Sequence, residues 1–131
     1  MAYPKVLALL LCENATRGPD EKVTLHGLFD RIIVPRTPSS PKLFFVYYKI
    51  VVDEPCKVAL RIVDASRSNS EVPGNWCDSI TEIGPAQSVW ALTTALLRHP
   101  GQYVLELRKE ADGSEALTLA TTLLSVEQEG L

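Results

Sequence analysis

Apolar and polar residues alternate along the chain with a period of two, most clearly between positions 103 and 108. Tyr103, Leu105 and Leu107 fall on one side of an extended chain and alternate with mostly polar neighbours. This pattern is typical of a β-strand with one buried face. Pro100-Gly101 before it and Asp112-Gly113 after it are turn signals, so we expect this strand to form a hairpin with the strand that follows.

Five further segments are rich in apolar and β-branched residues and are bounded by turn residues, which predicts strands. They span Lys5–Cys12, Lys22–Val34, Leu43–Val52, Lys57–Val63 and Glu115–Val126. Gly27 in the second of these segments predicts a bulge or bend, through which one long strand would serve two sheets. In the last segment Leu123 and Leu124 belong to different phases of the alternation, so we expect a bulge near Leu123.

Two stretches leave alternatives open. Asp64–Pro85 is rich in loop residues, and it is either a functional loop or contains a short strand over Trp76–Ile83. Ala86–His99 fits both the spacing of a helix and that of a strand. Thr93, Thr94 and the turn that follows favour the strand.

These elements predict an all-β fold, an antiparallel immunoglobulin-like β-sandwich of about seven strands with Greek-key connections. Tyr103 follows a turn, as does the tyrosine of the tyrosine corner, whose hydroxyl bonds to backbone across the corner. Leu105 stands where such domains usually carry a cysteine, so apolar packing would replace a disulfide. A chain of 131 residues suits a single domain, 1–131, with a core of its own.

The composition of the chain limits the kinds of partner and the cellular location that we expect. The net charge of −3 and the absence of a Lys and Arg cluster argue against nucleic acid as a partner. The apolar run that ends at Cys12 is too short to cross a membrane and fits a buried strand better than a signal peptide. Cys12, Cys56 and Cys77 are widely spaced, which indicates reduced thiols and a cytoplasmic location. Among them, Cys77 is expected to react fastest and Cys12 slowest with a thiol reagent.

The chain resembles a family of small uncharacterised bacterial β-sandwich proteins, a domain of unknown function. The resemblance rests on Gly27-Leu28-Phe29-Asp30-Arg31-Ile32-Ile33-Val34-Pro35, on Pro100-Gly101-Gln102-Tyr103 and on the opening apolar strand. It implies a bacterial source and an immunoglobulin-like fold. It implies no activity and supplies no functional residues.

The sequence shows no assembled catalytic constellation. His26 and His99 are the only histidines, and neither lies in a recognisable nucleophile motif. No two cysteine or histidine residues have the spacing of metal ligands. We therefore expect no enzyme activity, no cofactor and no metal.

Trp76, with Asn75 and Asp78, is the candidate contact for a ligand or partner, because an exposed aromatic in a loop can stack or dock. The alternative is that Trp76 packs beneath its own loop. Asp30 and Arg31, with Tyr103, are candidate structural residues. Asp30 and Arg31 point to opposite faces of a strand, so each is expected to form a cross-strand ion pair or cap a sheet edge, or else to anchor the proline-rich connection.

The sequence therefore predicts a non-catalytic protein-interaction or assembly module of the bacterial cytosol. The alternatives are a carbohydrate- or small-ligand-binding sandwich and a hydrolase with a histidine base. Lys5–Cys12 has no charged residue between Val6 and Cys12 to protect an exposed edge. This favours a homodimer with that region at or near the interface. The competing interpretation is that Asp64–Pro85 covers the strand within one chain.

Overall fold

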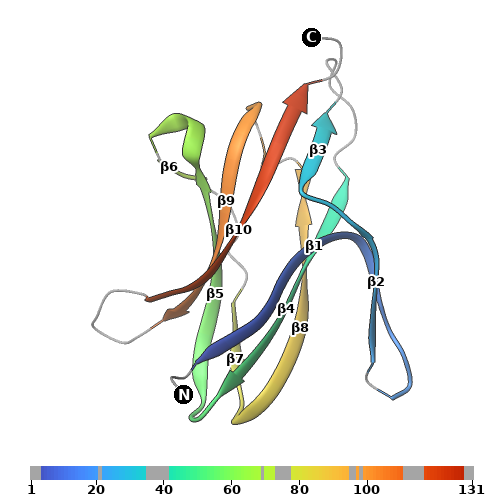
Figure 1. The fold of residues 1–131 in the computed structure, drawn as a ribbon, viewed down its shortest axis with the longest axis vertical. Helices are drawn as coiled ribbons and strands as arrows, with labels where there is room; N and C mark the ends of the chain where they lie inside the picture. Colours follow the sequence, from blue (N-terminus) through green and yellow to red (C-terminus); the bar gives the residue numbers. More distant parts are fainter. Residues whose placement is uncertain are drawn as a thin grey trace.

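The computed structural model describes residues 4–20, 22–34, 42–68, 70–72, 78–94, 97, 99–110 and 117–128. These residues form ten strands in two sheets that pack against each other (Figure 1). The first sheet has the order β2 (Val23–Leu28), β1 (Lys5–Arg17), β4 (Leu43–Val52) and β8 (Gly84–Thr93). The second has the order β3 (Arg31–Val34), β10 (Leu117–Gln128), β9 (Gly101–Glu110), β5 (Cys56–Asp64) and β6 (Ser70–Glu71), and β7 (Asp78–Thr81) also pairs with β5. One short 3-10 helix, Ala65–Arg67, follows β5.

The all-β sandwich expected from the alternation is confirmed. The chain passes between the sheets at β2–β3, β3–β4, β4–β5, β7–β8 and β8–β9. The strand orders β1-β4-β8 and β10-β9-β5 are those of the Greek-key arrangement of immunoglobulin-like domains. The expected number of about seven strands was too low. The pairing is not wholly antiparallel either, because β3 runs parallel to β10.

The first strand is longer than its apolar run. Lys5–Cys12 pairs with β4, and Cys12–Arg17 continues into a two-stranded arm with β2 that leaves the body of the sandwich (Figure 1). The sequence prediction ended at Cys12 because the residues beyond it are mostly polar and do not alternate with apolar ones. A hairpin arm is held by backbone hydrogen bonds and does not require a buried apolar face, so the alternation did not reveal it.

β2 pairs with β1 as far as Leu28, and the chain then crosses to the second sheet as β3. The φ of Gly27, 67°, lies in the left-handed region that favours glycine. Phe29 and Asp30 span the crossover, where the Ser125 amide donates to the Asp30 carbonyl at 2.9 Å. The segment Lys22–Val34 therefore serves both sheets as predicted, but it does so as two strands, and the change of sheet lies at Phe29–Asp30 and not at Gly27.

Replacing Gly27 by alanine should lower the free energy of unfolding by about 1–2 kcal/mol, because a side chain there is strained at positive φ. The added Cβ would also lie 2.8 Å from Glu13 Cδ. At Gly18 the Cβ of alanine would meet only the Lys22 carbonyl oxygen, at 3.6 Å. Urea denaturation of Gly27→Ala, with Gly18→Ala as the control, checks this. Equal costs at the two positions would contradict it.

The last strand changes phase earlier than the sequence suggested. The register of β10 against β9 shifts between Thr118 and Ala120, so the bulge predicted near Leu123 was wrongly placed. Leu124 is fully buried, and Leu123 is 61% exposed. Thr121 and Thr122 suit either face of a strand, so the sequence showed that the phase changes but not where.

Both open stretches contain strands in the part of the chain that the structure describes. β8 confirms the strand over the helix, and its Trp90 packs on Tyr48 with ring centroids 4.6 Å apart. β7 lies within the predicted Trp76–Ile83 strand. Within Asp64–Pro85, β6 and β7 pair with β5 in the second sheet, and Gly84–Pro85 begin β8, which pairs with β4. None of these described strands pairs with the first strand.

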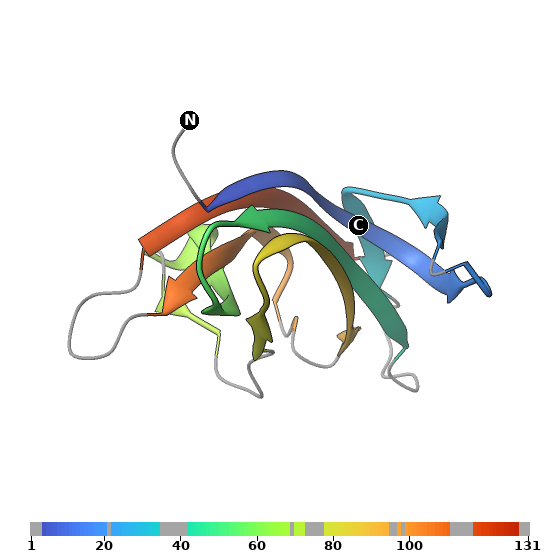
Figure 2. The same ribbon diagram turned by 90° about the horizontal axis from the view of Figure 1, so that it is seen from below.

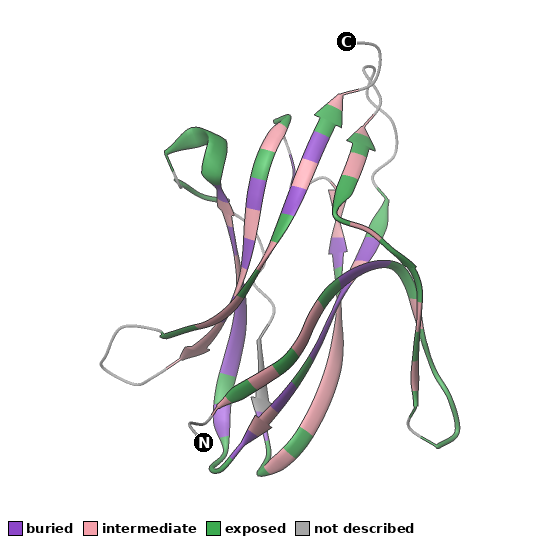
Figure 3. Cartoon of the chain, viewed as in Figure 1, coloured by how far each residue is buried: buried purple, intermediate pink, exposed green. Residues whose placement is uncertain are grey.

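The core lies between the inward faces of the two sheets, and its buried residues are concentrated on β4, β5 and β9 (Figure 3). Tyr103, Leu105 and Leu107 are each at most 1% exposed, which confirms the face predicted for that strand. The Tyr103 hydroxyl donates to the His99 carbonyl at 2.6 Å and accepts from the His99 amide at 3.2 Å. The tyrosine corner is therefore confirmed.

Candidate functional site

The structure does not test the contact surface that the sequence predicts. Asn75 and Trp76 lie outside the described residues, as does Cys77. Asp78 begins β7, where its backbone lies opposite Ala59 of β5. A contact surface at positions 75–78 therefore remains a prediction.

Arg31 and Asp30 both contact strand β10. The Arg31 Nη1 atom lies 3.7 Å from Glu127 Oε1 of β10, which confirms the cross-strand ion pair expected for Arg31. Asp30 lies in the bend between β2 and β3 and not within a strand, and its carbonyl joins the crossover to β10. Both residues thus attach the crossover to the second sheet.

The two histidines are exposed and lie on different elements. His26 Nε2 lies 3.4 Å from Thr16 Oγ1 on the arm, and His99 forms the tyrosine corner through its backbone. Within the part of the chain that the structure describes, no group of three or more His, Cys, Asp and Glu side chains is arranged to hold a metal. No described helix is long and apolar enough to cross a membrane.

Cys12 and Cys56 are free thiols in different sheets. Cys12 is completely buried, and burial raises the pKa of its thiol, partly offset by a hydrogen bond with the Asn14 backbone. Burial also raises the pKa of the Cys56 thiol, which the Lys109 charge lowers and nearby Glu54 and Asp53 raise. Both side chains therefore favour the unreactive protonated form at neutral pH.

In the native protein Cys12 should alkylate roughly tenfold or more slowly than Cys56, because Cys12 is completely buried whereas Cys56 is 9% exposed, and a reagent reaches a completely buried thiol only after local opening. Iodoacetamide labelling followed by peptide mass spectrometry measures both rates in one sample. The same protein in urea is the control, and the difference should vanish there. Labelling of native Cys12 as fast as Cys56 would contradict the buried position.

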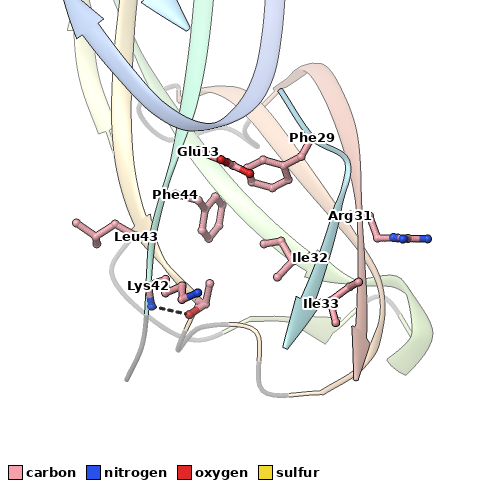
Figure 4. A pocket seen from close by; sticks show the side chains of 9 residues that line it. Glu13, Phe29, Arg31, Ile32, Ile33, Lys42, Leu43 and Phe44 are labelled. Carbon is pink, nitrogen blue, oxygen red and sulfur yellow. Dashed lines mark hydrogen bonds between the residues drawn. The ribbon is translucent and has the colours of Figure 1, made fainter. Parts of the chain in front are cut away.

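A hollow lies where the crossover from β2 to β3 faces the start of β4 (Figure 4). We call it the crossover cleft. Its volume is about 380 Å³. The residues that line it are Glu13, Phe29, Arg31, Ile32, Ile33, Lys42, Leu43, Phe44 and Thr94. Sequence reasoning missed this site because its residues come from four separate parts of the chain.

The centre of the crossover cleft is aromatic and aliphatic. The Phe29 and Phe44 rings meet edge to face, with centroids 6.0 Å apart and an interplanar angle of 69°. Ile32 points toward them from β3 (Figure 4). At one end, Lys42 and Thr94 join β4 to the end of β8, because the Lys42 amide donates to Thr94 Oγ1 at 2.9 Å and the Thr94 amide to the Lys42 carbonyl at 2.8 Å.

Charged residues lie at the ends of this apolar centre. Glu13 lies beside Phe29 at one end and Lys42 at the other, with Phe44 between them (Figure 4). Gly27 leaves room for the Glu13 side chain, since a Cβ at Gly27 would lie within 3 Å of it. Arg31 points away from the cleft toward its partner Glu127.

A second hollow of about 350 Å³ lies on the other side of the crossover, where β1 and β10 run side by side (Figure 2). Its lining residues are Leu10, Leu11, Leu28, Phe29, Asp30 and Thr122. Phe29 lines both hollows, so the two lie next to each other at the crossover.

The described lining of the crossover cleft is mainly apolar, and it includes no histidine, cysteine or serine. Apolar walls with a few charged groups at the margin are typical of sites that receive an apolar group.

Comparison with known proteins supports the fold. No protein-family model and no curated protein sequence matches the chain. It is similar in structure to the C-terminal domain of wzt, at 10% identity and a TM-score of 0.56, over 96% of this chain and 74% of that one. At this identity the likeness shows the fold alone.

Two weaker likenesses are to β-glucosidases. The enzyme from Listeria innocua in complex with isofagomine matches at 10% identity and a TM-score of 0.48, over 97% of this chain and 17% of the enzyme. The GH3 enzyme from Bifidobacterium adolescentis matches at 9% identity and a TM-score of 0.46, over 100% of this chain and 18% of the enzyme. The chain thus spans less than a fifth of either β-glucosidase.

Proposed function

We propose that this protein is a non-catalytic interaction module that binds a protein partner through the crossover cleft and the surface beside it. The observation that carries the proposal is the apolar centre of the crossover cleft, which Phe29, Ile32 and Phe44 form (Figure 4). Four of the eight exposed large apolar residues of the described chain, Leu10, Leu28, Ile33 and Leu43, are among the residues of the two hollows. An apolar centre with a charged margin is typical of protein interfaces.

A carbohydrate ligand fits the crossover cleft less well. Sugars stack on a flat aromatic face and use several hydrogen-bonding groups, whereas Phe29 and Phe44 meet edge to face and carry no polar atom. The carbohydrate-binding alternative therefore requires another site, such as the one predicted at Trp76. A glycan array tests it directly, and binding that is lost in Trp76→Ala would favour that alternative over ours.

Self-association through the first strand remains a separate prediction. Lys5–Leu11 pairs with β4 on one side, and β2 begins to pair only at Cys12. The register shifts beside Leu7, and a bulge of this kind protects an edge from pairing with another chain. This weakens the argument for a homodimer through that strand and leaves the crossover cleft as the better surface. The bacterial cytosol and the suspected family likewise remain predictions from the sequence.

Photo-crosslinking tests the proposed function. Benzoylphenylalanine at position 42, at one end of the crossover cleft, should give a protein adduct in an extract of the source cells. Position 83 is the matched control, because Ile83 is 67% exposed and lies near the opposite end of β4 from the cleft. An adduct found only at position 42 is the expected result. The absence of an adduct at 42, or the same adducts at both positions, would contradict the proposal.

A further inference from the structure

We infer that the partner segment seated in the crossover cleft carries a bulky apolar side chain between a basic residue and an acidic residue. This inference rests on the proposed function and specifies its partner. It comes from the two charges at the ends of the apolar centre. Glu13 would meet the basic residue and Lys42 the acidic one (Figure 4).

The apolar centre sets the middle of the segment. Phe44 is only 3% exposed and forms the wall of the cleft with Phe29 and Ile32. A volume of about 380 Å³ is enough for one large side chain and part of its backbone. An aromatic or large aliphatic residue seated there would remove water from the exposed faces of Phe29 and Ile32.

Neither end charge is neutralised by another residue that the structure describes. Among the described residues, neither Glu13 nor Lys42 takes part in an ion pair, whereas Arg31 is paired with Glu127. Opposite charges on either side of an apolar site select a partner whose own charges are placed in the complementary order. A segment with two like charges would meet one favourable and one unfavourable contact.

The solvent exposure of Glu13 and Lys42 determines how strongly the cleft should select for the charges of the partner segment. Both end residues are exposed, so each complementary contact should change the affinity by about two- to fivefold. The contribution of these charged contacts to the affinity should fall as salt is added, since exposed charges are screened. The apolar contact itself should be nearly independent of salt.

Four short peptides with blocked ends test the inference, and each has a central phenylalanine with a serine on either side. Outside these serines, the first peptide carries lysine at one end and glutamate at the other, the second carries two lysines, the third two glutamates, and the fourth only serines. Fluorescence anisotropy should rank the lysine–glutamate peptide tightest. Glu13→Lys should move the preference to the peptide with two glutamates, and Lys42→Glu should move it to the peptide with two lysines. Glu82→Lys and Lys49→Glu make the same charge changes at exposed positions outside the cleft and should leave the ranking unchanged.

The outcomes separate this inference from the proposed function. Binding of all four peptides with one affinity would overturn the inference and leave an apolar binding site. Failure of all four to bind would count against the proposed function as well. A dimer in light scattering that Lys42→Glu dissociates would identify the occupant as a second copy of this chain and would also overturn the inference.

Discussion

Replacing Leu124 by alanine should lower the free energy of unfolding by about 2–5 kcal/mol, the range for deleting a fully buried leucine side chain. Its neighbour Leu123 is 61% exposed, so Leu123→Ala should change that free energy by less than about 0.5 kcal/mol. The contrast arises because β10 changes phase between Thr118 and Ala120. From there onward, Leu124 points into the sandwich and Leu123 away from it.

Urea denaturation followed by far-UV circular dichroism measures both variants under one set of conditions. The two substitutions remove the same atoms from adjacent positions, so each controls for the other. A larger loss for Leu123→Ala than for Leu124→Ala would show that the phase of this strand is reversed. It would also place the bulge where the alternation in the sequence first suggested it, near Leu123.

The second large effect is expected at the tyrosine corner. Tyr103→Phe should cost about 1–3 kcal/mol, because it leaves the His99 carbonyl and amide without their partner. The ring itself stays in place, so the packing of the 1% exposed side chain is kept. The loss therefore reports the hydroxyl alone.

Tyr47→Phe is the matched control. The Tyr47 hydroxyl donates to Gln87 Oε1 at 2.6 Å, a contact between two side chains on neighbouring strands of one sheet. Its loss should cost about 0.5–1.5 kcal/mol. Thermal denaturation of both variants checks the order. A cost at Tyr103 no greater than that at Tyr47 would mean that the corner does not stabilise the crossing between the sheets.

Much of the fold follows from local patterns. The strand predicted over Leu43–Val52 has the same first and last residues as β4. Its run of β-branched and aromatic residues is bounded by turn signals on both sides. The positive φ at Gly27 and the hydroxyl contact of Tyr103 were also predictable, since each depends on one residue type in one local context. These features need no knowledge of distant neighbours.

The features that the sequence did not reveal depend on pairing between distant segments. The extension of β1 to Arg17 is decided by β2, and the phase of β10 by its register on β9. The crossover cleft joins Glu13, Phe29, Phe44 and Thr94, which lie far apart along the chain. No motif links them, so only the packing of the two sheets shows that they form one site.

Nuclear magnetic resonance tests most directly whether the crossover cleft is the binding surface. The lysine–phenylalanine–glutamate peptide is added to isotope-labelled protein, and the backbone amide shifts are followed. The largest changes are expected at Phe29, Ile32, Phe44 and Thr94, with none at Ile83. Shifts concentrated at Ile83 or along the outer face of the second sheet, with those of Phe29 and Phe44 unchanged, would contradict a binding site in the crossover cleft.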